Sequence, residues 1–127
     1  MEIQFILFVS NQEKSKQFYE LLLNKQPILD VEGMTEFRLN KNTKLGLMPK
    51  KGIAKLLVDR ENVLDVNEVP KCEIYIKVDD VLAWYNKSIE LGAKKENSPK
   101  ERDWGDFVGY VSDFDGNILA FAKQIKN

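Results

Sequence analysis

The side chains that could do chemistry in this chain are carboxylates, because the sequence contains no histidine. The Ser-His and Cys-His pairs of nucleophilic enzymes, zinc-protease helices and imidazole acid-base catalysis near neutral pH are therefore excluded. The sequence also lacks the glycine-rich motifs that bind the phosphates of mononucleotides and dinucleotides. A site in this protein must be built from Asp, Glu and neutral polar or aromatic side chains.

Two pairs of aspartates are interpreted as structural. Asp113 and Asp115 belong to the sequence Asp-Phe-Asp-Gly-Asn, which is typical of a tight turn. Asp79 and Asp80 stand where a helix is expected to begin, and an Asp at that place caps the first free backbone N–H groups. Neither pair is expected to be catalytic.

Glu73 is the one carboxylate that we consider as a candidate ligand-binding group. It begins an alternating segment in which Glu73, Tyr75 and Lys77 share one face of a strand, with aliphatic residues on the other face. One interpretation is an exposed glutamate at the start of a strand. The other is a carboxylate inside a cleft, where it meets a cation or a hydroxyl of a ligand.

The first half of the chain contains the elements of one module. Residues 3–9 form a strand-like run, and Ser10-Asn11-Gln12-Glu13 resembles a capping box that opens a helix. The helix is expected to carry an apolar stripe, which includes Phe18 and Leu22, and to end near Asn24. Residues 35–39 and 44–48 then alternate around a turn-forming cluster and predict a hairpin.

The second half repeats this order of elements. A strand over residues 73–78 precedes a helix that is ended by Gly92, and residues 107–112 and 118–123 predict a second hairpin. Neither half could bury both faces of its sheet alone, whereas two halves that face one another would enclose a cleft. We therefore expect one domain over residues 1–127, of the α+β class.

The domain is expected to consist of two tandem βαβββ modules, residues 1–48 and 72–127, with residues 49–71 as the connector. This connector is long for a structureless loop, so a short strand or helical turn is expected within it.

The stretches FILFVSNQEKSKQFYELLL and VGYVSDFDGNILAFA resemble the opening strand and helix and the closing hairpin of the vicinal oxygen chelate superfamily. This superfamily includes glyoxalases, bleomycin-resistance proteins, fosfomycin-resistance enzymes and extradiol dioxygenases. The resemblance covers nearly the whole chain and implies a curved mixed sheet around a cleft. Phe114 stands where the family usually has a proline. Because the superfamily spans unrelated chemistries, the resemblance specifies the fold more than the function.

The resemblance also indicates where a metal would be held. Enzymes of the family bind a divalent metal through histidines and carboxylates at positions that correspond here to Gln4, Gly46, Glu73 and Ala120. Of these four, Glu73 alone is a good ligand, and a protein metal site generally needs three or more donors. The resemblance therefore implies a member without the metal centre and without another cofactor.

Alternation on the first strand directs Gln4, Ile6 and Phe8 toward the cleft. Aromatic residues on the cleft face could sandwich a flat ligand. Trp104 lies in the polar segment Asp103-Trp-Gly-Asp106, where a large ring has little reason to join the core. The candidate ligand-binding residues are Gln4, Phe8, Glu73, Tyr75, Trp104 and Tyr110.

Three functions are compatible with these residues. The first is a metal-free binding protein, resembling the bleomycin-resistance branch, in which a dimer sequesters an antibiotic or metabolite without altering it. The second is an enzyme, a glyoxalase-like lyase or dioxygenase that uses Glu73 in a displaced metal site. In the third, side chains fill the cleft and the domain is an interaction or regulatory module. The first is preferred, so the protein is expected not to be an enzyme.

Composition limits the partners. Nineteen basic and twenty acidic residues give a formal charge of −1, so neither nucleic acid nor anionic lipid is expected to bind. The N-terminal stretch has no basic region, and its longest apolar run, from Phe5 to Val9, is too short for a signal sequence or a membrane span. The single Cys72 favours a reducing cytoplasm. The expected partners are a small organic ligand and, from the resemblance, a second copy in a homodimer.

Overall fold

The computed structural model describes residues 1–56 and 69–125. It contains the helices α1 (Gln12–Leu23), α2 (Lys50–Leu56) and α3 (Val81–Glu90). The strands are β1 (Ile3–Val9), β2 (Leu29–Val31), β3 (Met34–Asn40), β4 (Thr43–Pro49), β5 (Cys72–Lys77), β6 (Lys94–Glu101), β7 (Asp106–Ser112) and β8 (Ile118–Gln124). Within these residues no helix is long and apolar enough to cross a membrane.

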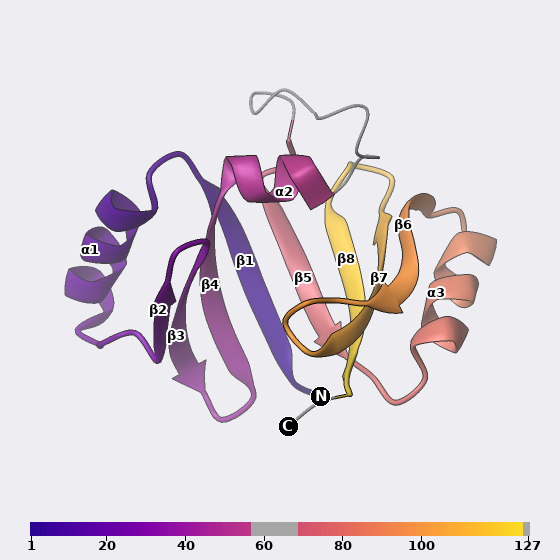
Figure 1. Cartoon of the computed structure of the whole chain (residues 1–127), viewed down its shortest axis with the longest axis horizontal. Helices are drawn as coiled ribbons and strands as arrows, with labels where there is room; N and C mark the ends of the chain where they lie inside the picture. Colours follow the sequence, from indigo (N-terminus) through magenta and orange to yellow (C-terminus); the bar gives the residue numbers. More distant parts are fainter. Residues whose placement is uncertain (57–68, 126–127) are drawn as a thin grey trace.

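All eight strands form one mixed sheet in the order β2-β3-β4-β1-β5-β8-β7-β6 (Figure 1). In each half the first strand lies parallel to the last, β1 beside β4 and β5 beside β8. The halves join where β1 runs antiparallel to β5, with Gln4 opposite Tyr75 and Ile6 opposite Glu73. The expected α+β fold with a curved mixed sheet is confirmed.

Local signals explain the ends of α1, with one correction. The expected capping box at Ser10 is wrong by one residue, because Asn11 is the N-cap and its side chain accepts a hydrogen bond from the backbone N–H of Lys14 (2.9 Å). Asn24 ends the helix in the left-handed conformation (φ 52°), as expected.

The second module follows the predicted signals more closely. Asp80 caps α3 by accepting from the N–H of Ala83 (3.1 Å), and Gly92 follows the helix with φ +112°. Between β7 and β8, the Asp113 carboxylate accepts from the N–H groups of Asp115 and Asn117 (both 2.9 Å), which confirms the turn interpretation. These hydrogen bonds, with one from the Asn117 side chain, lower the pKa of Asp113.

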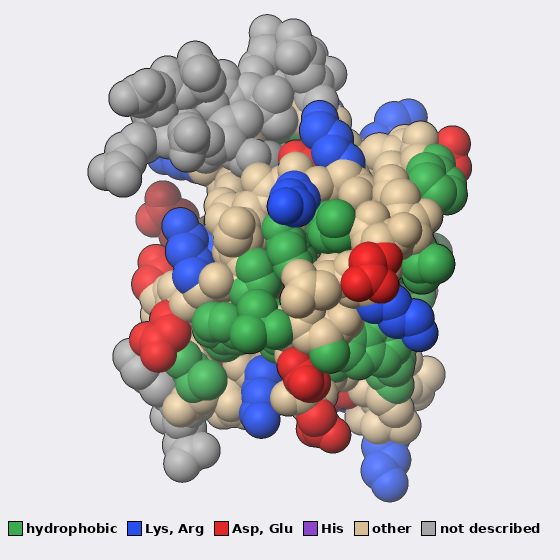
Figure 2. Space-filling view, turned by 90° about the vertical axis from the view of Figure 1, so that its right-hand side faces the viewer, with side chains coloured by type: hydrophobic (Ala, Val, Ile, Leu, Met, Phe, Trp, Pro, Cys, Tyr) green, Lys and Arg blue, Asp and Glu red, His purple; other side chains and the backbone are tan. Residues whose placement is uncertain are grey.

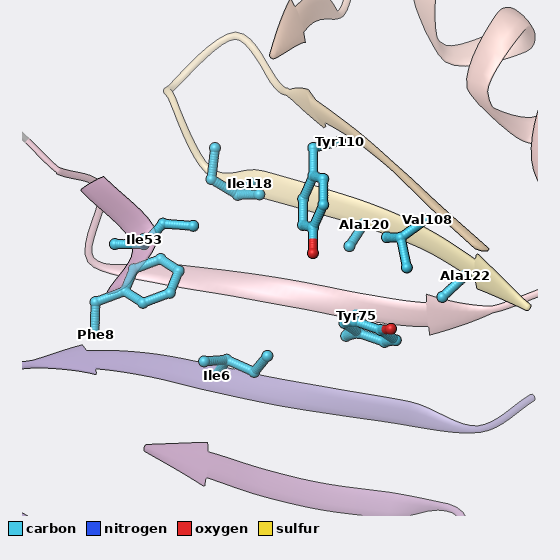
Figure 3. Close-up of a cluster of buried hydrophobic side chains, with 9 residues drawn as sticks. All are labelled: Ile6, Phe8, Ile53, Tyr75, Val108, Tyr110, Ile118, Ala120 and Ala122. Atoms are coloured by element: carbon cyan, nitrogen blue, oxygen red, sulfur yellow. The ribbon is translucent and has the colours of Figure 1, made fainter. Parts of the chain in front are cut away.

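The sheet has two apolar faces because side chains alternate along each strand. On β8, Ala120 and Ala122 belong to one face, whereas Phe121 packs under α3 with Val81 and Tyr85. We call the first the inner face and the face that carries α1 and α3 the outer face. The connector contains α2, which places Ile53 on the inner face. The inner-face cluster, drawn in Figure 3, comprises Ile6, Phe8, Ile53, Tyr75, Val108, Tyr110, Ile118, Ala120 and Ala122.

Candidate functional site

Glu73 lies in the middle of the inner face. It is opposite Ile6 on β1 and Ile118 on β8, two members of the apolar cluster. Only 2% of its surface is exposed, so the interpretation as an exposed strand residue is wrong. Within residues 1–56 and 69–125 its carboxyl group makes no hydrogen bond or ion pair. Because burial penalises the charged form, the pKa of Glu73 is raised to about 8.

Tyr110 is the polar neighbour of Glu73 in the second module. The tyrosine is 2% exposed, and the guanidinium of Arg102 lies over its ring, 5.1 Å from the ring centroid. Burial raises the pKa of Tyr110, and the nearby Glu73 carboxylate raises it further. Two buried groups that resist ionisation thus stand close together in an apolar setting.

The segment between β6 and β7 crosses the inner face in front of β5 and β8 (Figure 1). The Trp104 indole N–H donates to the Tyr75 hydroxyl (2.9 Å), and that hydroxyl donates to Asp106 Oδ2. Burial, followed by the hydrogen bond to Asp106, raises the pKa of Tyr75. Trp104 is 49% exposed, so its ring covers the site from the solvent side.

Arg102 holds this segment against the sheet. Its guanidinium donates to the backbone carbonyls of Val108 (2.9 Å) and Ser98 (3.1 Å), and the residue is 9% exposed. Sequence reasoning missed it, because an arginine between Glu101 and Asp103 reads as a solvated residue. Its burial depends on the return of the chain over the inner face, for which the sequence has no local signal.

Gln4 lies on the first-module side of the same face. Its amide donates to Glu36 Oε2 (2.8 Å), and the other oxygen of Glu36 accepts from Lys44 Nζ (3.1 Å). Beside this group is a hollow of about 10 Å³, which is room for one water molecule. Its lining residues are Glu2, Ile3, Gln4, Lys44, Tyr75 and Lys77.

The structure places all six candidate residues at the inner face. Phe8, Tyr75 and Tyr110 belong to its apolar cluster, and Trp104 reaches it from the β6–β7 segment. Gln4 and Glu73 contribute its buried polar groups. The neighbours that sequence reasoning missed are Glu36, Lys44, Ile53, Arg102 and Asp106.

The family metal positions do not fit a divalent ion in this chain. A side chain cannot be added at Gly46 without displacement, because its Cβ would lie 2.6 Å from Gln4 Nε2. Ala120 offers no donor, and no group of three or more His, Cys, Asp or Glu able to hold an ion occurs in the described part of the chain. We therefore derive no chemistry through a metal at these positions.

Comparison with known proteins identifies the class. Residues 3–126 match the family model of the glyoxalase-like domain. The uncharacterized protein YraH of Bacillus subtilis (strain 168) is 30% identical over 126 residues, which cover 97% of this chain and 98% of YraH. The chain therefore belongs to the glyoxalase-like domain family, within the vicinal oxygen chelate superfamily, as its terminal motifs predict.

Solved structures support the same fold. A crystal structure from Legionella pneumophila, described as an NAD-dependent benzaldehyde dehydrogenase, superposes with a TM-score of 0.71 at 20% identity and covers 96% of this chain and 98% of that one. A glyoxalase/bleomycin resistance protein/dioxygenase superfamily member from Vibrio splendidus 12B01 has a TM-score of 0.65 at 13% identity and covers 97% and 98%. At such identities the likeness concerns the fold alone.

Proposed function

We propose that this protein binds a small organic molecule, an antibiotic or a metabolite, at the inner face of its sheet without metal chemistry. The observation that carries the proposal is the Glu73 carboxyl group, 2% exposed among apolar side chains and without a partner in the described residues. A buried polar group without a hydrogen-bond partner destabilises the folded protein. A bound ligand that supplies the missing partner removes this cost, so such a group indicates a binding site.

The surroundings of Glu73 suit an apolar ligand with one polar group. Phe8, Tyr75 and Tyr110 belong to the inner-face cluster and provide aromatic ring surface there (Figure 3). A carboxyl group with a pKa near 8 donates a hydrogen bond when neutral and pairs with a cation when charged. A ligand amine or hydroxyl would therefore be directed at Glu73, with the rest of the ligand against the aromatic rings.

A ligand that contacts Glu73 needs neighbouring side chains to move, because that residue is 2% exposed. The hollow beside Gln4 holds about 10 Å³, far less than the volume of a drug-sized ligand. Trp104 is the side chain best placed to move, because it is half exposed and its indole is joined to the face by the hydrogen bond to Tyr75. We propose that Trp104 swings outward and then covers the bound molecule.

A thermal-shift screen tests the proposal. The probes are aryl amines, phenols and a panel of antibiotics, each measured with EDTA and with added MnCl2 or ZnCl2. A ligand at 100 times its Kd stabilises the folded protein by about 2.7 kcal/mol, which raises Tm by roughly 10 °C in a domain of this size. We expect such a rise in EDTA for the wild type, no rise for Glu73→Gln, and the full rise for Glu101→Gln, an exposed carboxylate outside the site.

Other outcomes favour the other two functions. Stabilisation that needs Mn²⁺ or Zn²⁺ and disappears in Glu73→Gln would contradict metal-free binding and favour a lyase or dioxygenase with a displaced metal site. If no probe shifts Tm under either condition, the interaction module with a filled cleft becomes the better account.

A further inference from the structure

Arg102 is a buried cation of the inner face, and one edge of its guanidinium has no partner. Its Nε and Nη2 atoms both donate to the carbonyl of Val108 (3.3 and 2.9 Å), and Nη2 also donates to Ser98 O (3.1 Å) and Asn97 Oδ1 (3.3 Å). Nη1 donates to no group within residues 1–56 and 69–125. The anchored edge therefore fixes the planar guanidinium, and the Nη1 edge is left for another acceptor.

No carboxylate pairs with Arg102 in the part of the chain that the structure describes. The ion pairs found there all use lysine as the cation. Asp106, at the other end of the same segment, accepts from the Tyr75 hydroxyl instead. Burial lowers the pKa of Arg102. The backbone carbonyls compensate this burial, but they do not supply the opposite charge that a buried cation usually has.

Tyr110 lies next to both Arg102 and Glu73. Its side chain extends from β7, beside Ala120 of β8, toward β5, which carries Glu73 (Figure 3). Arg102 lies over the ring, 5.1 Å from its centroid. Burial raises the pKa of Tyr110, Glu73 raises it further, and Arg102 lowers it, because both charges are close to the phenol. A carboxyl group and a guanidinium thus border one aromatic ring, and neither forms an ion pair among the described residues.

The exposed charges on the α3 side of the molecule are mixed in sign. Figure 2 shows lysine and arginine side chains there interspersed with acidic and apolar ones, so the described surface of that side has no patch of one sign. The formal charge of −1 adds no general attraction for anions. Recognition of an anionic ligand would therefore depend on the buried guanidinium of Arg102.

We propose that the ligand of the inner face is an amphoteric molecule, whose carboxylate pairs with Nη1 of Arg102, whose amine meets Glu73 and whose apolar body lies against Tyr110. This inference rests on the proposed function and specifies the chemical class of its ligand. The amine and the carboxylate stand at opposite ends of the molecule, because Glu73 and Arg102 border one ring without pairing with each other. Each protein group would gain from the ligand the opposite charge that the described residues do not give it.

Isothermal titration calorimetry of the full-length protein in EDTA tests this inference. The probes are 4-(aminomethyl)benzoate, benzylamine and 4-methylbenzoate, which share one ring and differ in their charged groups. The wild type is expected to bind 4-(aminomethyl)benzoate at least about 10-fold more tightly than benzylamine, since the carboxylate adds a charge-assisted hydrogen bond. In Arg102→Gln this ratio of affinities should fall to about 1, and Arg102→Lys, which keeps the charge, should recover part of it.

Lys100→Gln is the matched control, because it removes an exposed cation close to Arg102 in the sequence and should leave the ratio unchanged. A purely structural role of Arg102 would weaken the binding of benzylamine and 4-(aminomethyl)benzoate together, so the ratio separates the two roles. Binding of 4-methylbenzoate should require Arg102 but persist in Glu73→Gln. This probe thus separates the role of Arg102 from the role of Glu73 in the proposed function.

Several results would overturn the inference. Equal affinity of the wild type for benzylamine and 4-(aminomethyl)benzoate would do so without any variant and would leave the proposed function standing. An Arg102→Gln protein that is folded by far-UV circular dichroism and keeps the ratio, or a Lys100→Gln protein that loses it, would also overturn it. If none of the three probes binds while another compound raises Tm in the thermal-shift screen, the amphoteric ligand is wrong and ligand binding stands. If no compound binds at all, both proposals fail.

Discussion

Two buried polar residues, Glu73 and Arg102, differ in how they are held. Arg102 donates to the carbonyls of Val108 and Ser98 and to the Asn97 side chain, so its burial is compensated. Glu73 makes no such contact within the described residues. Alternation along β5 predicted the face on which Glu73 lies, but its burial depends on β1 and β8, which flank it from distant parts of the sequence.

The raised pKa of Glu73 predicts a particular dependence of stability on pH. The native carboxyl keeps its proton up to about pH 8, whereas the unfolded chain releases it near the ordinary value of 4.5. The native state therefore binds more protons in this window, and wild-type stability should fall as the pH rises from about 4.5 to 8. Glu73→Gln cannot ionise, so it should equal the wild type near pH 4.5 and exceed it by a few kcal/mol above pH 8.

Urea unfolding at several pH values between 4.5 and 8.5 measures this difference. Glu101→Gln serves as the control, because an exposed carboxylate should give a profile parallel to that of the wild type. If Glu73→Gln and the wild type also ran parallel across the range, Glu73 would not be held neutral by burial.

Among the elements, the helices show where local signals suffice. Asp80 caps α3, and Asn24 and Gly92 end α1 and α3, as residue types in short windows indicate, whereas the N-cap of α1 is Asn11 and not the expected Ser10. Sequence patterns did not predict the edge strands β2 and β6, because β2 has three exposed residues and the sequence of β6, KKENSPKE, lacks an apolar alternation. These two strands form because they pair with β3 and β7.

Alanine substitutions at two glycines are expected to change the stability of the protein in opposite directions. Gly92→Ala should destabilise the protein by about 1–2 kcal/mol, because φ is +112° and the new Cβ would lie 2.9 Å from the Phe114 ring. Gly52→Ala, inside α2, should stabilise it by roughly 0.5–1 kcal/mol, since alanine favours the helix and its nearest neighbour is the flexible end of Met48. Urea midpoints measured together check both signs, and a stabilised Gly92→Ala would contradict the left-handed cap.

On the scale of the whole molecule, the two modules share one core. Ile6 and Phe8 of the first module pack in one cluster with Tyr75 and Tyr110 of the second, and the β1–β5 ladder joins their sheets. The modules should therefore unfold together rather than one after the other.

Phe37→Ala tests this coupling, because Phe37 is fully buried in the first module and both tryptophans lie in the second. Removal of the ring should cost about 3–5 kcal/mol, with tryptophan fluorescence and far-UV circular dichroism giving the same lowered urea midpoint. An unchanged fluorescence midpoint beside an earlier transition in circular dichroism would show that the modules are independent.

The sequence by itself determined the order of the main elements, the face to which each strand residue points, and the absence of donors at Gly46 and Ala120, since these follow from residue type and short-range periodicity. Tertiary structure alone decided that Glu73 is buried, that Arg102 and Trp104 return over the inner face, and that Phe18 and Leu22 of α1 stay exposed. Each of these depends on contacts between residues far apart along the chain, or on the absence of such contacts among the described residues, and periodicity within one segment does not encode them.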